Sequence, residues 1–384
     1  MIPLSVPHIS GNEWKYVKDC LDTGWVSSVG KYVDRFEGDI CGYTGARHAV
    51  GCANGTAALQ VALRLVGVVP GDEVIVPTLT FIAPVNAARY LGAEPVFMDC
   101  DDFYCIDAEK TADFILKETA FRKGETRNKR TNRRVSAIVP VHVFGNAAAL
   151  EDLVRICAER KIRIVEDAAE SLGTYYTSGA LQGKFTGTVG EIGCYSFNGN
   201  KIITTGGGGM IVTDSDEYGE RARYLTTQAK DESLRYIHND VGYNFRLTNI
   251  QAAIGVAQLE RLPEYLEIKR RNYMHYAREL RGVPGVRLAG APGYARSNHW
   301  FYCLQIDATA YGRNRDELMT HLSAHGIETR PVWFPNHLQR PYRDCQRYRI
   351  EKALGLLEST LNIPCSVGLD RSSIEKVTRI LKNE

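Results

Sequence analysis

The residues best suited to chemistry are a carboxylate and an amine, each close to the end of a short apolar segment. Asp167 ends segment 164–167, in which apolar residues precede two carboxylates. Charge at the end of a buried strand is unfavourable unless a cation lies nearby. Lys201 follows segment 193–196 and a turn, so one amine is presented beyond a second short strand. Strands of one parallel sheet end at a common edge, where ligands collect, so we expect Asp167 and Lys201 to meet there.

Two glycine-containing turns are suited to binding an anion. Residues 54–56, Asn-Gly-Thr, form a strand-to-helix turn whose free N–H groups and Thr56 hydroxyl can hold a phosphate. Residues 206–209 are all glycine and lead into another apolar segment. Ser196 adds a hydroxyl between these turns in the sequence. The pattern therefore predicts a phosphate close to the carboxylate and the amine.

Pyridoxal 5′-phosphate requires this combination of groups. Its aldehyde needs an amine, which Lys201 supplies, and its pyridinium nitrogen stays protonated beside a carboxylate such as Asp167. A metal site is not expected, because no cysteine pair has the spacing of zinc ligands. The residues expected around the phosphate and the ring of the cofactor are Gly55, Thr56, Ser196 and Phe81.

Short apolar runs alternate with amphipathic helical runs and would position these residues. Strands are expected at 48–52, 73–77, 95–98, 135–140 and 162–165, with a helix at 55–66 and others between the later strands. This order indicates a mainly parallel sheet with helices on both faces. After residue 212 the pattern changes to a long helical region at 249–280, interrupted at Pro263. We therefore predict a large domain over 1–259 and a smaller α+β domain over 260–384.

Composition excludes several classes of protein. The chain has 384 residues, of which 44% are hydrophobic and 24% charged, with a net charge of +2. This balance is typical of a globular protein and gives no overall attraction to nucleic acid or acidic lipid. We expect no membrane span, because no long apolar run occurs, and no signal peptide. Ten single cysteines fit a reduced cytoplasmic protein.

Basic side chains crowd residues 122–134. The segment can be an anion-binding patch, but a solvated loop between a helix and a strand is the favoured interpretation. It has no interleaved aromatic residues on which bases could stack, so it does not indicate nucleic-acid binding.

Longer motifs resemble a known family. Residues 166–173 (EDAAESLG), 196–201 (SFNGNK) and 242–248 (GYNFRLT) are similar to the sugar-nucleotide aminotransferases of the DegT/DnrJ/StrS type. The resemblance extends from 24–28 to 335–342. It implies the aspartate-aminotransferase fold, which is fold type I of the pyridoxal phosphate enzymes. It also implies a homodimer with shared active sites.

The resemblance also implies roles for individual residues. Lys201 matches the lysine that binds the cofactor aldehyde, and Asp167 matches the partner of the pyridine nitrogen. Glu170 matches a position, often Gln, that faces the phenolic oxygen, and Asn244 matches a phosphate ligand from the other subunit. The matches at the phosphate and the ring are the residues expected above: Gly55, Thr56, Ser196 and Phe81.

Within the family, the motifs are most similar to enzymes of legionaminic acid and bacillosamine-type pathways. Those enzymes transfer an amino group from glutamate to C4 of a nucleotide-linked 4-keto-6-deoxy-2-acetamido sugar, and 2-oxoglutarate is released. A perosamine synthase acting on a GDP sugar and a 3-keto sugar aminotransferase remain alternatives. Another fold-type-I activity, such as a lyase or an ordinary amino-acid aminotransferase, is less favoured because of the motif at 196–201. A non-catalytic regulator is less favoured because no DNA-reading segment is apparent.

A sugar diphosphate needs cationic partners near the site. Candidates are Arg246, in the motif that contains Asn244, and His337, in a proline-rich loop. The alternative is that Arg246 pairs with a neighbouring carboxylate and His337 packs within its loop.

Overall fold

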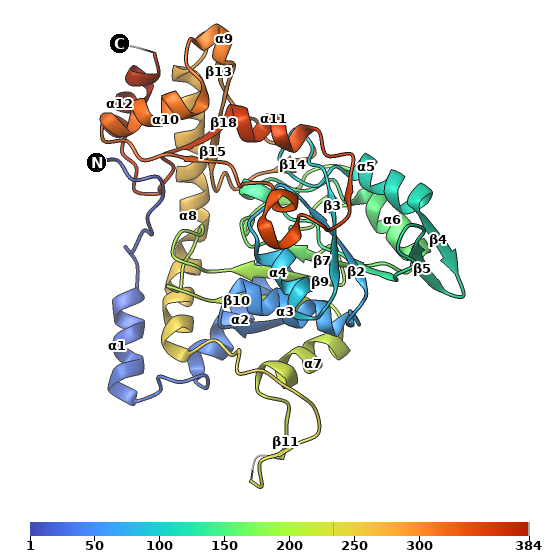
Figure 1. The fold of residues 1–384 in the computed structure, drawn as a ribbon. Coiled ribbons are helices and arrows are strands. Elements are labelled where there is room, and N and C mark those ends of the chain that lie inside the picture. Colours follow the sequence, from blue (N-terminus) through green and yellow to red (C-terminus); the bar gives the residue numbers. More distant parts are fainter. Residues whose placement is uncertain (233, 383–384) are drawn as a thin grey trace.

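An eight-stranded sheet forms the centre of the computed structural model, which describes residues 1–232 and 234–382 (Figure 1). Its strands lie in the order β1, β10, β9, β7, β6, β2, β3, β17. Strand β10 is antiparallel to both neighbours, whereas β9, β7, β6, β2, β3 and β17 pair in parallel. The mainly parallel sheet is therefore confirmed. The bounds are β1 (His48–Cys52), β2 (Glu73–Pro77), β3 (Glu94–Met98), β6 (Val135–Ile138), β7 (Arg163–Asp167), β9 (Ile192–Ser196), β10 (Gly209–Thr213) and β17 (Arg347–Tyr348).

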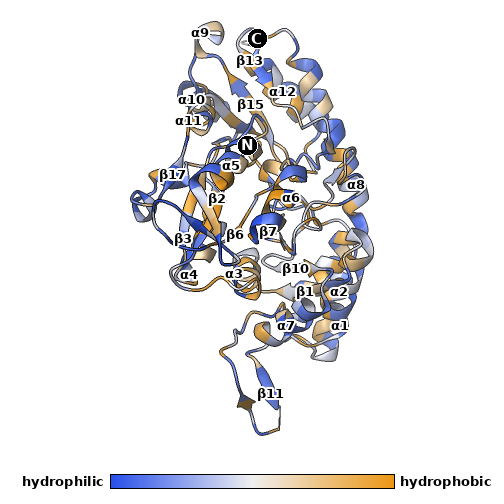
Figure 2. Cartoon of the chain, turned by 90° about the vertical axis from the view of Figure 1, so that its right-hand side faces the viewer, coloured by the Kyte–Doolittle hydropathy of each residue, from blue (hydrophilic) through white to orange (hydrophobic). Residues whose placement is uncertain are grey.

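Helices cover both faces of this sheet, so its strands are apolar on both sides. One core includes Leu59 of α3 and Val85 of α4, packed with Val76 and Val165 of the sheet. Another includes Phe36, Phe197 and Val256 and contains residues of α2 and α8. Figure 2 shows hydrophobic residues concentrated in the central strands. The helices are α1 (Glu13–Thr23), α2 (Lys31–Thr44), α3 (Gly55–Leu65), α4 (Ala83–Tyr90), α5 (Ala108–Asp113), α6 (Glu151–Arg160), α7 (Asp216–Thr226) and α8 (Asn249–Glu279).

The C-terminal part contains a separate antiparallel sheet in the order β13, β15, β18, β16. Residue Ile2 also joins this part, since its N–H donates to Gly326 O at 2.7 Å. The division at 259/260 falls within α8 and stays a proposal. The elements are β13 (Val286–Leu288), β15 (Tyr302–Ile306), β16 (Arg330–Pro331), β18 (Thr360–Ile363), α9 (Ala308–Tyr311), α10 (Arg315–Ala324), α11 (Lys352–Ser359) and α12 (Arg371–Leu381).

Two local expectations differ from the structure. Helix α8 continues through Pro263, whose ring is exposed, so solvent can replace the hydrogen bond that proline removes. Much of the basic segment 122–134 belongs to a hairpin of β4 (Thr119–Arg122) and β5 (Glu125–Asn128) rather than to a loop. Several of its cations are paired, including Arg134 with Asp72 at 2.5 Å. This segment is therefore held by ion pairs to the body of the protein.

Short elements complete the fold. A hairpin of β11 (Lys230–Glu232) and β12 (Ile237–His238) projects away from the body (Figures 1 and 2). Within the described residues, no helix combines the length and apolar character needed to cross a membrane. The remaining elements are β8 (Tyr175–Tyr176), β14 (Ala295–Arg296), a π-helical turn (Phe114–Glu118) and the 3-10 turns Val143–Gly145, Asn336–Leu338 and Arg340–Tyr342.

Asp99 links the large sheet to the C-terminal part. It follows β3, is fully buried, and accepts hydrogen bonds from the N–H groups of Glu351, Lys352 and Ala353 at the start of α11. Its fourth donor is Lys110 Nζ, at 2.7 Å. Burial alone would raise the pKa of Asp99, but Lys110 and these N–H groups outweigh it and hold the pKa below its ordinary value. The ionised form is therefore the one that stabilises the fold.

We expect Asp99→Asn to lower the free energy of unfolding by about 1–3 kcal/mol at pH 7, because an amide cannot serve all four donors. Since folding lowers the pKa, this contribution is complete above the ordinary value of 3.8 and is lost as the pH falls through the folded value. Urea unfolding of both proteins from pH 7 to pH 3 measures it. A difference that is constant over this range would contradict the charge argument. Asp102→Asn, at an exposed position, is the control.

Candidate active site

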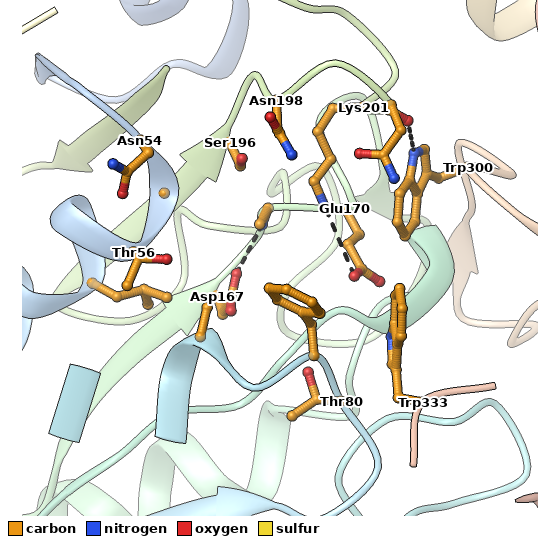
Figure 3. A pocket seen from close by; sticks show the side chains of 16 residues that line it. Asn54, Thr56, Thr80, Asp167, Glu170, Ser196, Asn198, Lys201, Trp300 and Trp333 are labelled. Atoms are coloured by element: carbon orange, nitrogen blue, oxygen red, sulfur yellow. Dashed lines mark hydrogen bonds and ion pairs between the residues drawn. The ribbon is translucent and has the colours of Figure 1, made fainter. Parts of the chain in front are cut away.

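A cavity of about 280 Å³ lies at the edge of the sheet where the parallel strands end (Figure 3). Strand β7 contributes Asp167, β9 contributes Ser196, and the turn after β9 contributes Lys201. The loop after β2 and the start of α3 form other walls. The cavity is lined by Asn54, Gly55, Thr56, Leu59, Thr80, Phe81, Ala83, Asp167, Ala169, Glu170, Ser196, Asn198, Asn200, Lys201, Trp300 and Trp333.

The start of α3 forms an anion-binding end. The side chain of Asn54 accepts from Ala57 N–H at 2.8 Å, whereas the N–H groups of Gly55 and Thr56 lie in the first turn and have no intrahelical partner. Ser196 closes the opposite side. A Cβ at Gly55 would lie 2.9 Å from the Cβ of Ser196, so only glycine fits this approach. Two amide donors, two hydroxyls and a positive helix end suit a phosphate.

Asp167 provides a buried negative charge at the other end. One of its oxygens accepts from Ala169 N–H at 3.0 Å. Burial raises the pKa of Asp167, although this hydrogen bond and the positive charge of Lys201 act against the rise. Within the described chain, the second carboxylate oxygen has no hydrogen-bond donor. A cation in the cavity would therefore stabilise the ionised form.

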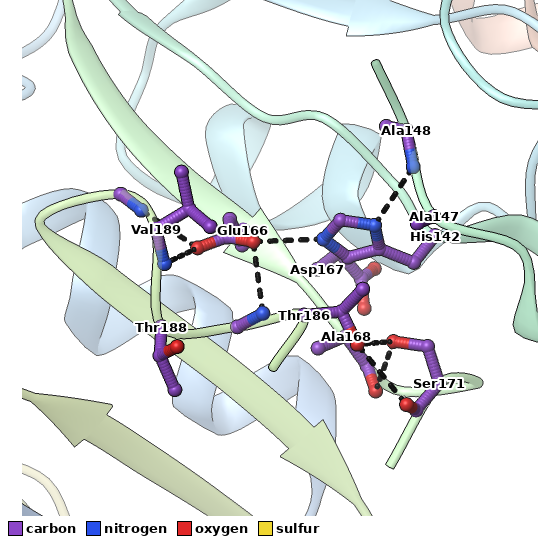
Figure 4. Close-up of polar contacts among 12 residues, drawn as sticks. His142, Ala147, Ala148, Glu166, Asp167, Ala168, Ser171, Thr186, Thr188 and Val189 are labelled. Carbon is purple, nitrogen blue, oxygen red and sulfur yellow. Dashed lines mark hydrogen bonds and ion pairs between the residues drawn. The ribbon is translucent and has the colours of Figure 1, made fainter. Parts of the chain in front are cut away.

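The neighbouring carboxylate, Glu166, points to the other side of β7 (Figure 4). It accepts from His142 Nε2 at 2.9 Å and from the N–H groups of Gly187, Val189 and Gly190 at 2.6–2.8 Å. Ala148 N–H donates to His142 Nδ1, so the ring carries its proton on Nε2. Burial would raise the pKa of Glu166, but these donors lower it overall. Glu166 therefore fixes a loop, and Asp167 alone of this pair faces the cavity.

Lys201 lies between a carboxylate and an aromatic ring. Its Nζ is 3.8 Å from Glu170 Oε1 and 4.1 Å from the centre of the Trp300 ring. Burial raises the pKa of Glu170 to about 7, although Lys201 and the N–H of Phe144 act against the rise. The arrangement presents one amine beside a carboxyl group that exchanges a proton near neutral pH.

Aromatic side chains and unpaired polar atoms form the remaining wall. Phe81 is half exposed and meets Trp333 edge to face, with ring centres 5.5 Å apart. The hydroxyl of Thr80 and the indole N–H of Trp333 are buried without a hydrogen-bond partner in the described residues. A buried polar group without a partner destabilises the fold unless a ligand supplies one. These two groups are therefore suited to bind a polar ligand.

The structure brings together seven of the residues expected at the site. They are Lys201, Asp167, Gly55, Thr56, Phe81, Glu170 and Ser196. Asn244 is exposed and does not line the cavity of its own chain, so its expected contact with the other subunit stays a prediction.

Arg246 and His337 do not line the cavity either. Arg246 Nη1 lies 2.7 Å from Glu37 Oε1, and both side chains are buried. His337 Nδ1 lies 2.6 Å from the hydroxyl of Thr78. These are the structural roles that the sequence left open as alternatives. Substrate binding by either residue stays a prediction that no contact in this chain supports.

Sequence reasoning missed Trp300, Trp333 and Thr80 as cavity residues. The first two lie more than 95 residues after Lys201 in the C-terminal part, and no local spacing connects them to it. Thr80 precedes Phe81, so the aromatic prediction placed this loop correctly but not its hydroxyl.

The donor set fits pyridoxal 5′-phosphate. The helix end and hydroxyls suit its phosphate, Asp167 its pyridinium nitrogen, Lys201 its aldehyde and Phe81 its ring. Together with the sheet order, these groups define a pyridoxal phosphate-dependent transferase of fold type I.

The chain belongs to the DegT/DnrJ/EryC1/StrS aminotransferase family, whose sequence profile matches residues 7–382. It is 38% identical to a GDP-perosamine synthase of Caulobacter vibrioides, over 99% of this chain and 97% of that protein. It is 33% identical to the UDP-N-acetyl-3-dehydro-α-D-glucosamine 3-aminotransferase of Acidithiobacillus ferrooxidans, over 90% of this chain and 86% of that protein. The crystal structure of DesI in the presence of its TDP-sugar product has a TM-score of 0.87 and 29% sequence identity, covering 100% of this chain and 92% of that chain. The protein is therefore a pyridoxal phosphate-dependent sugar aminotransferase.

We expect Lys201→Ala to lower amino transfer by at least about a thousand-fold, because no other amine lines the described cavity. Release of 2-oxoglutarate from glutamate measures the rate. Lys184→Ala, at an exposed position outside the cavity, should react as the wild type does. Near-normal turnover by Lys201→Ala would contradict the assignment of the reactive amine.

Proposed function

We propose that the protein transfers the amino group of glutamate to C4 of a nucleotide-linked 4-keto-6-deoxy hexose. The observation that carries the proposal is Lys201, an amine held beside Glu170 in a cavity that also contains Asp167 and an anion-binding helix end. The GDP-perosamine synthase relative supports a nucleotide sugar as acceptor.

The residues have separate tasks in this reaction. When bound, pyridoxal 5′-phosphate supplies an aldehyde and an electron-withdrawing ring. Lys201 Nζ takes the proton from Cα of the amino donor, and in the second half-reaction it returns a proton to the sugar carbon. Asp167 keeps a positive charge on the ring nitrogen, since its carboxylate favours the protonated form. The N–H groups of Gly55 and Thr56 orient the phosphate.

Three candidate sugars differ in the substituent at C2, in the nucleotide or in the carbon that is aminated. The motifs at 196–201 and 333–337 favour a 2-acetamido sugar of the legionaminic acid or bacillosamine type. GDP-perosamine synthases among the relatives favour a GDP-linked sugar as the second candidate. Amination at C3 is supported by the relative that acts on a 3-dehydro sugar.

A panel of substrates distinguishes these candidates. Purified protein with glutamate is offered a UDP-linked 2-acetamido-4-keto-6-deoxy sugar, a GDP-linked 4-keto-6-deoxy sugar and a UDP-linked 3-keto sugar. We expect the highest kcat/KM with the first. Preference for the second identifies the perosamine type, and preference for the third contradicts amination at C4. Failure of all three, with glutamate still converted, contradicts these three acceptors and with them the proposed substrate.

Trp333 and Thr80 are the groups of this cavity best placed to recognise the sugar. Their unpaired N–H and O–H can bond to a hydroxyl or carbonyl, and the rings of Trp333 and Phe81 offer apolar faces to its C–H groups.

We expect Trp333→Phe, which keeps a ring but removes the donor, to raise KM for the sugar about ten-fold. The glutamate half-reaction should change less than about two-fold, because the amine and Asp167 are untouched. Steady-state kinetics with each substrate varied in turn measures both. Tyr90→Phe, at an exposed position, is the control. Equal damage to both half-reactions would instead assign Trp333 to the cofactor or the fold.

We also propose a homodimer with shared active sites. Apolar side chains are strongly exposed near α1 and around the β11–β12 hairpin, including Trp14 at 76%, Leu234 at 84% and Val241 at 73%. Such exposure is typical of surfaces that another protein covers. Asn244 is exposed close to this hairpin, so a partner subunit can use it where its own chain does not.

Mixing two inactive variants tests the shared site. Lys201→Ala and Asn244→Ala, mixed under conditions of subunit exchange, should recover about one quarter of the wild-type rate, since half of the dimers contain one intact site. Amino transfer after exchange measures the recovery. No recovery, with exchange proven by differently tagged chains, would indicate a self-contained site.

A further inference from the structure

Trp300 joins the turn of Lys201 to the C-terminal part of the chain. Trp300 is 1% exposed, and its indole Nε1 donates a hydrogen bond to the backbone oxygen of Asn200 at 2.7 Å. The face of the same ring lies 4.1 Å from Lys201 Nζ (Figure 3). One side chain therefore contacts both the turn and the amine that it carries.

Three contacts hold Trp300 in place. Its backbone N–H donates to Asn298 Oδ1 at 2.8 Å, and its backbone oxygen accepts from Lys269 Nζ at 2.7 Å. Its ring stacks on Phe301, with centres 4.0 Å apart and planes at 10°. Lys269 is a buried amine on α8, and burial lowers its pKa. Its Nζ donates hydrogen bonds to the backbone oxygens of Trp300 and Cys365, so it acts as a fixed support.

The segment that carries Trp300 also holds the backbone of Glu170, whose carboxylate lies beside the amine. Asn298 Nδ2 donates to the backbone oxygens of Glu170 and Leu172, both at 3.0 Å. Gly145 permits this approach, because a Cβ there would lie 1.9 Å from Asn298 Oδ1. The backbone of Glu170 and the ring of Trp300 are thus set by the same segment, and Lys201 Nζ lies near both.

We propose that Trp300 is a positioning residue for Lys201, whose free ammonium group rests on the face of the indole ring. A cation over an aromatic face is attracted by the negative charge of that face, most strongly with tryptophan and away from water. The ring therefore attracts the ammonium group and holds it at the cavity wall. Glu170 acts from the other side, and Asp167 adds a second negative charge. This inference rests on Lys201 as the reactive amine of the proposed function.

The test measures the amine without relying on turnover. Full-length protein is loaded with pyridoxamine 5′-phosphate, which leaves Lys201 free, and is treated with acetic anhydride at pH 7. Mass spectrometry then gives the labelling rate of Lys201, with exposed Lys18 as internal reference. Only an unprotonated amine reacts. We expect Trp300→Met to raise this rate about ten-fold, whereas Trp300→Phe, which keeps an aromatic face, stays within about three-fold of the wild type.

A matched control is available in the same cavity. Trp333→Met removes a second tryptophan that makes no contact with the amine in the described structure, so Lys201 should be labelled at the wild-type rate. Wild-type labelling of Trp300→Met, or the same increase in Trp333→Met, overturns the inference. In kinetics, Trp300→Met should lower kcat about ten-fold in both half-reactions and change each KM less than about two-fold.

Fluorinated tryptophans introduced at position 300 alone answer the question even if Trp300→Met does not fold. Fluorine withdraws charge from the ring face with little change in shape, so the labelling rate of Lys201 should rise with each added fluorine. A rate independent of fluorine content overturns the inference. These outcomes are distinct from failure of the proposed function, in which Lys201→Ala itself retains amino transfer.

Discussion

The charge of Asp167 at the end of β7 is the constraint on which the site depends. Two other carboxylates near strand ends, Asp99 and Glu166, are also buried, and each has four donors within the chain. Asp167 has one, from Ala169. Because a buried charge needs a partner, Asp167 is the carboxylate of the three that leaves room for a cation from outside the chain. The sheet thus separates charges that support the fold from the one available to a cofactor.

The large sheet alone does not complete the cavity. Its loops supply Asp167, Lys201 and the anion-binding turn, but the C-terminal part supplies Trp300 and Trp333. Contacts between the two parts are specific, as in the capping of α11 by Asp99 and the hydrogen bond from the Trp300 indole to the backbone oxygen of Asn200. A change that weakens the contact between the two parts is therefore expected to disturb the geometry of the site as well.

Local patterns predicted the strands and the residues that directly follow them. The order of short apolar runs and helices indicated the parallel sheet, and its common edge brought Asp167, Ser196 and Lys201 together. Spacing does not reveal which partner a charged side chain finds. Arg246 was a candidate for binding the substrate, yet its guanidinium pairs with Glu37, more than 200 residues earlier. Spacing did not reveal Trp300 either, because its contact with Lys201 exists only once the C-terminal part has packed against the large sheet.

The cavity is a place where the chain gives up stability. Burial raises the pKa of both Asp167 and Glu170, and the polar groups of Thr80 and Trp333 lack partners within the described residues. Each of these features disfavours the folded chain by itself, and each is relieved by a ligand of complementary chemistry: a cation at Asp167 and hydrogen-bonding groups at Thr80 and Trp333. A ligand that binds only the folded state stabilises it in proportion to the logarithm of its concentration over Kd. Loading with cofactor and sugar therefore restores stability where the unliganded site lacks it, which couples the integrity of the fold to occupation of the site.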